Sequence, residues 1–400
     1  AIREVFPLKY WFGYLTAGIF GAITWVLMQF GRRFATLVDM VYPYVIRTLQ
    51  SILAQWSGGV DFPIWQLLAV ALGMLILTSI VLMIVLKWNP IQWFGWVLAV
   101  FSGIYLLHMA MWGMNYYAGS LADDMRLEVS SYNLEELTEA TEYYRDKANA
   151  LAGQVNRDSS GNVQFASFEE LADKAGEGFH TLTYVNHYPV FAGCQLPVKK
   201  LDWADMYTSM GITGYTFGIT GEACVNPQIP DVLLPFTMAH EMAHRMCIAS
   251  ERDANFAGFL ACSVHSDPEF QYSAYFMAFR YCYTALCGVN TQSAAAAAAR
   301  VKEGIGEKLR YDWNAYDAFF SQKQDTKATK FADTVNDTYL KTSGEESGIA
   351  SYAEVCDLLV NWHIQTVVLP AITVEKSVFD PYDENMVDLS GIVNARESIG

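Results

Sequence analysis

The chain has 400 residues, of which 52% are hydrophobic and only 17% charged, and its formal net charge is −16. So small a charged fraction is unusual for a water-soluble protein and indicates a membrane-embedded portion. The acidic balance argues against nucleic acid as a partner. The seven cysteines form no CxxC pair, which is typical of free buried thiols rather than of a disulfide framework.

Three uncharged stretches near the N-terminus are long enough to cross a lipid bilayer. They cover about residues 10–31, 62–86 and 91–113, and each matches the roughly 20 residues that a spanning helix needs. The first stretch ends at the basic pair Arg32 and Arg33 without a small-residue cleavage site, so it is typical of a span rather than of a signal peptide. We therefore predict a transmembrane region over residues 1–114 and a second domain over residues 115–400.

The segment between the first two spans, residues 32–61, has an amphipathic pattern. Its apolar residues at helical spacing, with Arg47 and Gln50 interleaved, are Val38, Val41, Val45, Ile46, Leu49 and Leu53. The pattern fits an interfacial or re-entrant helix, and it fits equally a helix packed against the second domain. His108, inside the third span, is either a functional intramembrane group or a hydrogen-bonding partner for a neighbouring helix.

The sequence gives little information about the orientation of the spans in the membrane. With three spans, the N-terminus and the loop between the second and third spans lie on one side of the membrane, and they carry three basic residues, Arg3, Lys9 and Lys87. The opposite side also carries three before the second domain begins, Arg32, Arg33 and Arg47. The positive-inside rule therefore does not decide the orientation. A short N-terminus before an uncleaved first span usually stays inside the cell. On that ground we expect residues 115–400 to lie outside the cytoplasm.

The second domain is predicted to be mostly helical with a small β-sheet. Helical patterns cover residues 133–155, 168–176, 233–286, 293–309 and 355–368. The glycine-rich stretch 190–225, interleaved with Thr, Tyr, Phe and Ile, predicts short strands joined by turns. Within it, residues 215–220 are the candidate for an edge strand that holds a substrate in extended form, and a structural hairpin explains them equally well.

The segment 240–244 has the sequence HExxH, which carries most of the chemical information in the chain. On a helix, His240 and His244 lie one turn apart on the same face, where one divalent metal can accept both imidazoles. Glu241 projects beside them and can polarise a metal-bound water. The pattern predicts a zinc site with two histidine ligands and a carboxylate base.

Glu251 is the candidate for the third ligand. If the helix ran on past His244, Glu251 would lie about 10 Å further along the axis, so the helix must break. Ser250 and Asp253 form an S-x-x-D pattern that predicts a capping box, with a second helix starting at Glu251 and a turn over residues 245–249. Asn255, one turn further on, can then hydrogen-bond a ligand. Asp253, His265 and Asp267 are reserve ligands.

Residues 251–257 resemble the E-x-x-A-N third-ligand segment of gluzincin-type metallopeptidases, here unusually close to the HExxH. The close spacing is similar to that of a family of bacterial membrane zinc metallopeptidases with three N-terminal transmembrane helices and a domain of unknown function. Further similar segments are residues 112–116, 220–223, 234–237, 336–341, 351–352 and 357–359. The resemblance implies a zincin-like domain anchored in the bacterial cell membrane. One departure is Cys247, where members of that family commonly have glycine.

These observations predict a membrane-anchored zinc metallopeptidase that hydrolyses a protein or peptide substrate. Glu241 would take a proton from the zinc-bound water and deliver it to the leaving amine. A second oxyanion donor is usually needed, and the candidates are His265, Tyr272, Tyr275 and Arg280.

Two alternatives compete with this prediction. An intramembrane protease would carry HExxH inside a span, but charged residues follow the motif closely here. A membrane sensor or scaffold would use zinc for structure or signalling, with a fourth ligand such as Cys247 or His265 closing the site. Glu241 favours hydrolysis, because a structural site has no need of that carboxylate.

Overall fold

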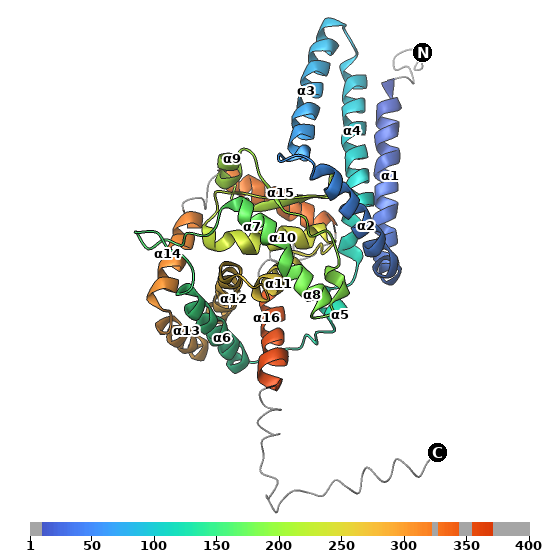
Figure 1. Cartoon of the computed structure of the whole chain (residues 1–400). Helices are drawn as coiled ribbons and strands as arrows, with labels where there is room; N and C mark the ends of the chain where they lie inside the picture. The colour runs from blue at the N-terminus through green and yellow to red at the C-terminus, as the bar shows by residue number, and fades with distance from the viewer. Residues whose placement is uncertain (1–9, 322–326, 344–353, 371–400) are drawn as a thin grey trace, which may run out of the picture.

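The computed structural model describes residues 10–321, 327–343 and 354–370. Three long helices stand beside a mostly helical body that contains one small sheet (Figure 1). The predicted fold class is therefore confirmed. Residues 351–352, which contributed to the family resemblance, lie outside the described residues.

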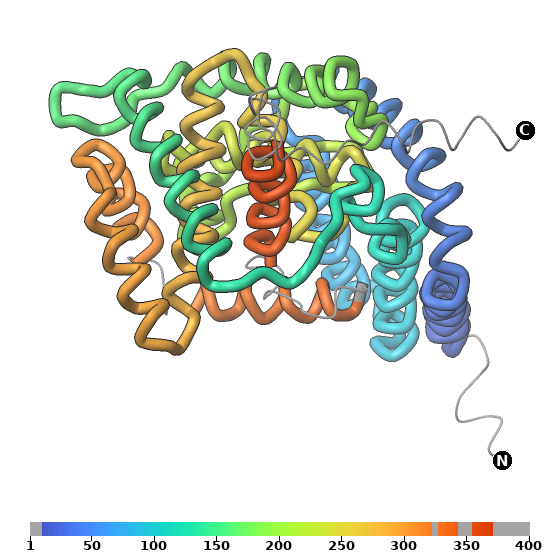
Figure 2. The backbone as a smooth tube through the Cα atoms, turned by 90° about the horizontal axis from the view of Figure 1, so that it is seen from below, coloured from blue at the N-terminus to red at the C-terminus, as the bar shows by residue number. Residues whose placement is uncertain are grey.

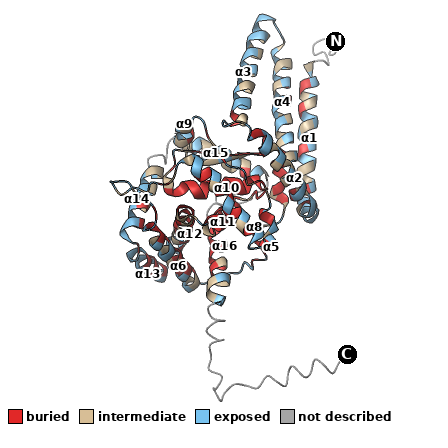
Figure 3. Cartoon of the chain, in the orientation of Figure 1, coloured by how far each residue is buried: buried red, intermediate tan, exposed pale blue. Residues whose placement is uncertain are grey.

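The three predicted spans are present as α1 (Phe12–Arg33), α3 (Ile64–Val85) and α4 (Pro90–Met111), each long and apolar enough to cross a membrane. Their helices begin and end within about three residues of the predicted limits. Helices α1 and α4 pack closely, because a Cβ atom on Gly13 would collide with the main chain of Gly95. Small residues at such a crossing let two membrane helices approach each other. Most large side chains of α3 are exposed, as a helix facing lipid requires (Figure 3).

Helix α2 (Ala35–Ser57) forms from the amphipathic segment and connects α1 to α3. One face packs against the body: Gln50 Nε2 donates to the carbonyl oxygens of Met111 and Gly218, and Arg47 Nε donates to the carbonyl of Met246. The opposite face leaves large apolar side chains exposed, including Val41. Of the two interpretations of this segment, packing against the body is confirmed for the inner face, and the interfacial position of the apolar outer face stays a prediction.

The body is built around one hydrophobic core that involves most of its helices, which cluster beside the long N-terminal helices (Figure 2). The helices are α5 (Leu121–Met125), α6 (Leu134–Ala152), α7 (Phe168–Lys174), α8 (Gly176–Tyr184), α9 (Ala204–Ser209), α10 (Leu234–Arg245), α11 (Glu251–Ser263), α12 (Pro268–Gly288), α13 (Gln292–Glu303), α14 (Glu307–Ser321), α15 (Lys327–Ser343) and α16 (Val355–His363). Single helical turns occur at η3 (Gly113–Tyr117), η4 (Pro189–Phe191) and η5 (Asp231–Leu233), and η7 (Ile364–Val368) continues α16. Helix α10 lies at the centre and is buried along its whole length (Figure 3).

The sheet has the order β1-β3-β2 and lies between α10 and the start of α3. Strand β3 (Glu222–Val225) is central, β1 (Lys199–Lys200) pairs with it in parallel, and β2 (Gly214–Phe217) pairs antiparallel, with Thr216 opposite Ala223. The expected edge strand is therefore present as β2, but it ends at Phe217. The chain turns through Gly221, whose φ of +68° suits glycine.

The prediction of one continuous helix over residues 293–309 is wrong. The chain forms two helices, α13 and α14, which are separated by residues 304–306. Gly304 and Gly306 lie in this break, where the Arg145 guanidinium and the Asn149 amide pack close to the glycine backbone. Helix α15, which lines the cleft over the candidate ligands, was not predicted from the sequence.

Candidate metal centre

Helix α10 presents the two histidines of the HExxH motif to one point. Pro235 occupies its first turn, where no hydrogen-bond donor is required, and the main-chain nitrogen of Phe236 donates to Ser273 Oγ. The imidazole rings of His240 and His244 lie one turn apart, with centroids separated by 4.6 Å and planes nearly perpendicular. The predicted arrangement of two imidazoles on one helix face is present.

The chain reverses after α10 through a tight turn. Cys247 N donates to the carbonyl of His244, and Ile248 N donates to that of Ala243, which is the Schellman pattern of a helix end. This pattern requires a left-handed residue, and Cys247 takes that role with φ of +73°. Glycine adopts this conformation without strain, whereas Cys247 adopts it with a Cβ atom.

Helix α11 begins at Glu251, as predicted from the sequence. The predicted capping box is wrong, because the side chain of Ser250 caps no main-chain nitrogen. Asp253 instead accepts a hydrogen bond from Leu121 N at 2.9 Å and pairs with Arg252 at 3.0 Å. The carboxylate that the pattern assigned to the cap therefore joins α11 to the start of α5.

Three ligand atoms converge where α11 folds back onto α10. His240 Nε2 lies 3.1 Å from His244 Nε2, and Glu251 Oε2 lies 3.2 Å and 3.4 Å from these two nitrogens. Ligand atoms at about 2.0–2.1 Å from a tetrahedral zinc lie about 3.3 Å from each other, so the triangle has the dimensions of three zinc ligands. Within the described residues, these three side chains are the group that could hold a metal ion.

The hydrogen bonds and charges of the site suit a bound cation. His244 Nδ1 donates to the carbonyl of Ile248 at 2.8 Å, which leaves the Nε2 lone pair directed at the ligand triangle. Burial lowers the pKa of His244, but the Glu251 carboxylate outweighs it and raises this pKa to about 9. Burial raises the pKa of Glu251, but the two imidazoles hold it well below its usual range. A buried carboxylate between two imidazoles thus favours positive charge at this point.

Glu241 is buried beside the ligands and is held by β2. The Thr216 hydroxyl lies 2.7 Å from Glu241 Oε2 and 2.9 Å from its main-chain oxygen. Gly214 packs directly against the carboxyl group, where any side chain would collide with it. Burial raises the pKa of Glu241, while His240 and His244 act in the opposite direction. A carboxylate with a raised pKa is suited to proton transfer near neutral pH.

A cleft of about 620 Å³ opens over the ligands. One wall is residues 210–216, including the first part of β2, and the opposite wall is α15. The α15 residues that line the cleft are Phe331, Ala332, Asp333, Val335, Asn336 and Tyr339. Trp112 and Tyr116 complete it, and Trp112 Nε1 donates to the carbonyl of His244 at 3.2 Å. Residues 215–220 were expected to hold substrate, but the contacts of Thr216 and Gly214 with Glu241, and the α15 wall, were not predicted.

The expected oxyanion donors His265 and Tyr272 lie outside this cleft. His265 bonds to the carbonyl of Lys174 at 3.1 Å, and Tyr272 donates to Asp312 at 2.5 Å. The reserve ligand Asp267 also lies elsewhere, paired with Lys174 at 2.9 Å. These polar side chains hold the body together away from the metal-binding triangle.

The other two expected donors, Tyr275 and Arg280, are also remote from the ligands. Tyr275 packs among aromatic rings that include Phe259, and Arg280 pairs with Asp317 at 2.9 Å. Asn255 is buried on α11, but its amide nitrogen donates to no described protein group. The expected hydrogen bond from Asn255 to a ligand is therefore not formed. The hydroxyl groups that do line the cleft belong mainly to tyrosine and threonine, and the sequence spacing gave no signal for them.

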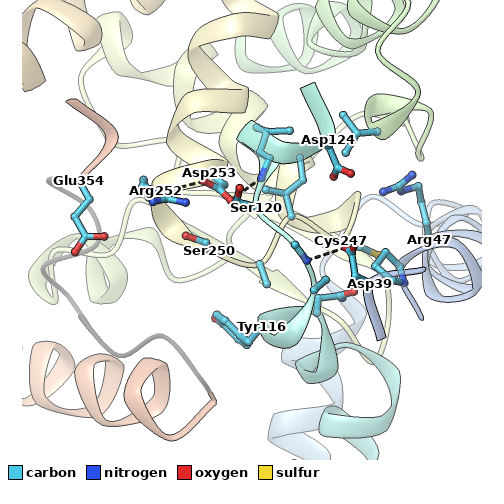
Figure 4. Close-up of a pocket in the computed structure, with 18 residues that line it drawn as sticks. Asp39, Arg47, Tyr116, Ser120, Asp124, Cys247, Ser250, Arg252, Asp253 and Glu354 are labelled. Carbon is cyan, nitrogen blue, oxygen red and sulfur yellow. Dashed lines mark hydrogen bonds and ion pairs between the residues drawn. The ribbon is translucent and has the colours of Figure 1, made fainter. Parts of the chain in front are cut away.

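A second, smaller pocket of about 220 Å³ lies against the Cys247 turn (Figure 4). Two of its carboxylates have main-chain partners: Asp39 accepts from Gly119 N at 2.8 Å, and Asp253 accepts from Leu121 N. Among the described residues, the carboxylates of this pocket do not form a group that could hold a metal ion. The pocket is a junction between α2, α5 and α11.

The comparison with protein families gives one match. A family model described as a protein of unknown function (DUF3810) matches residues 38–360, which include two of the spans, the sheet and all three candidate ligands. No curated protein and no solved structure matches the chain. The description of this family names no activity. The metallopeptidase therefore stays a prediction.

Proposed function

The chain belongs to the family described as a protein of unknown function (DUF3810), and within it we propose a membrane-anchored zinc metallopeptidase. The observation that carries the proposal is the triangle of His240 Nε2, His244 Nε2 and Glu251 Oε2, with Glu241 lining the same cleft. Zinc held by these atoms would lower the pKa of a bound water and polarise the substrate carbonyl.

Glu241 has the position and environment of a general base. Its carboxyl group can accept the proton of the attacking water and then deliver it to the leaving amine. Thr216 and Gly214 fix this carboxyl group from β2, so the base is oriented before substrate arrives. Tyr339 and Tyr116 line the cleft and take the place of the expected donors as candidates for stabilising the oxyanion.

The edge strand β2 provides a place for an extended substrate. Strand β3 occupies one side of β2, and residues 214–216 of β2 line the cleft. A peptide lying along this edge would place a main-chain carbonyl near the ligands.

The rival interpretations receive less support. A closed structural site would need a fourth protein ligand, but His265 bonds to Lys174, and Cys247 lines the other pocket. The HExxH helix α10 is not among the three candidate spans, which argues against an intramembrane protease. Hydrolysis is the function that accounts for both the open cleft and Glu241.

The decisive experiment is zinc stoichiometry by elemental analysis of the full chain purified in detergent. We expect about one zinc per chain in the wild type and in Glu241→Gln, and strongly reduced zinc in His240→Ala and Glu251→Ala. A peptide-library screen then compares the wild type with the zinc-loaded Glu241→Gln control, which should be inactive. A folded wild-type chain that takes up no added zinc would contradict the peptidase. A zinc-loaded wild type as inactive as its control would favour the sensor or scaffold.

A further inference from the structure

The second span leaves the body at the sheet that borders the cleft. The first main-chain nitrogens of α3, those of Ile64 and Trp65, donate to the Glu222 carboxylate on β3 at 2.8 and 2.9 Å. The Trp65 ring packs on Tyr215 and Phe217 of β2, with centroids 5.4 and 5.6 Å away. One face of β2 therefore contacts the foot of a spanning helix, while the other face contacts α10.

The third span ends beside the ligands. Trp112 directly follows α4, and its ring centroid is 6.1 Å from that of His244. His108, in the last turn of α4, shares a hydrogen bond of 3.0 Å with the Tyr339 hydroxyl on α15. Both walls of the cleft are thus attached to the ends of helices that can span a membrane.

Large apolar side chains are exposed around the cleft on this same side. Phe331 and Val335 on α15 are 66% and 52% exposed, and Trp203 and Met206 at the start of α9 are 51% and 46% exposed. Helices α9 and α15 lie at the end of the body nearest the foot of α3 (Figure 1), and the hydrogen bond between Tyr339 and His108 joins α15 to the end of α4. Several large apolar side chains exposed on neighbouring elements are typical of an interaction site, and tryptophan is enriched where proteins meet the headgroups.

The outer face of α2 is also apolar. Its exposed side chains include Leu37, Val41, Val45, Ile52 and Trp56. Helix α2 joins the end of α1 to the start of α3, so a bilayer that holds these spans also reaches the outer face of α2. The continuity with three spans identifies lipid, rather than a second protein, as the occupant of this surface.

We propose that the mouth of the cleft lies against the lipid headgroups, so that the substrate is the polypeptide segment next to a membrane anchor. The substrate assignment rests on the proposed peptidase activity, whereas the position of the mouth does not. A bilayer at the rim of the cleft would block the approach of a folded soluble protein. A segment that emerges from the membrane would instead enter between β2 and α15, where Phe331 and Val335 offer apolar contacts.

The position of the mouth can be tested without any activity. An environment-sensitive fluorophore is attached at Met206→Cys on α9, and in a matched control at Glu139→Cys on α6, both in a Cys287→Ala background because Cys287 is the exposed cysteine. Each full-length protein is placed in nanodiscs of phosphatidylcholine brominated near the headgroup end of the acyl chains. Strong quenching at position 206 with little at position 139 is expected. Equal, weak quenching at both positions would overturn the proposal.

The substrate class is tested with one cleavable sequence in three forms. In proteoliposomes, the peptide is supplied free, joined to a transmembrane helix by about five residues, or joined by about 20 residues. Five extended residues reach only about 17 Å, so efficient cleavage of the short-linker form requires a cleft at the membrane surface. We expect this form to be cleaved at least about tenfold more efficiently than the free peptide, since anchoring raises the local concentration.

The outcomes separate the two proposals. Cleavage of the long-linker form but not of the short-linker form would place the cleft away from the bilayer and overturn the inference. Preference for the free peptide would overturn the substrate class. If the zinc-loaded protein cleaves none of the three, the peptidase and its substrate class both fail, and the lipid quenching still decides where the mouth lies.

Discussion

Cys247 controls the turn that brings the third ligand back to the histidines. Its left-handed conformation costs an L-residue about 1–2 kcal/mol, and glycine avoids that cost. We predict that Cys247→Gly is more stable than Cys247→Ala by about 1 kcal/mol, because both variants remove the sulfur and only alanine keeps the strained Cβ. Thermal unfolding of both variants in detergent measures the difference. Equal stability would show that the turn relaxes around the side chain.

Thr216 is the residue that orients Glu241, and its role can be separated from metal binding. Replacing it with valine keeps the shape but removes the hydroxyl that lies 2.7 Å from Glu241 Oε2. We predict unchanged zinc content and a kcat lowered about tenfold, which corresponds to about 1.4 kcal/mol of a hydrogen bond to a charged group. Thr216→Ser should retain the rate. Loss of zinc in Thr216→Val would mean that the residue supports the ligands instead.

The candidate ligands could be predicted because they follow from short-range geometry. His240 and His244 are fixed by the period of one helix, and Glu251 by a break that the same period demands. Thr216 could not be predicted, because its contact depends on how β2 packs on α10. The four expected oxyanion donors do not line the cleft for the same reason: α12 and the loop before it place them against other parts of the body.

At the scale of elements, α11 is held in place by a close crossing with α8. A Cβ atom on Gly178 would collide with the carbonyl group of Ala261, so alanine cannot fit without moving one helix. We predict that Gly178→Ala destabilises the protein by about 1–3 kcal/mol. Gly288→Ala, at the end of α12 with open space around it, is the matched control and should be nearly neutral. Thermal unfolding compares the stability of the two variants. Equal stability would mean that α8 and α11 move apart at little cost in free energy.

The spans could be predicted from composition, because an uncharged stretch of spanning length has few other structures open to it. Helix α15 was missed, since it buries few of its own side chains, and its apolar residues Phe331 and Val335 face a cleft rather than a core. The break between α13 and α14 was missed although two glycines mark it, because the alanine-rich pattern on its N-terminal side favours a continuous helix.

At the scale of the whole molecule, a buried ion pair of the body holds the connection between α2 and α3. Lys199 Nζ lies 2.8 Å from Glu222 Oε1 and also donates to the carbonyl oxygens of Ser57 and Phe62, between α2 and α3. The same Glu222 carboxylate accepts the main-chain nitrogens that begin α3. Glu222 therefore acts as the cap of a spanning helix, supplied by a strand more than 150 residues away.

Removal of this carboxylate should loosen the body from the membrane helices. Glu222→Ala leaves the buried Lys199 ammonium without its counter-charge and two helix nitrogens without acceptors, so we predict a loss of about 3–5 kcal/mol. The exposed pair between Lys200 and Glu169 is the matched control, and Glu169→Ala should have little effect on stability because water screens this pair. The readout is limited proteolysis between α2 and α3, which should be rapid in Glu222→Ala and slow in Glu169→Ala.

Equal protection in both variants would mean that the contacts of α2 and Trp65 hold the two parts together without the ion pair. In that case the distance between the cleft and the membrane surface would depend on apolar packing alone.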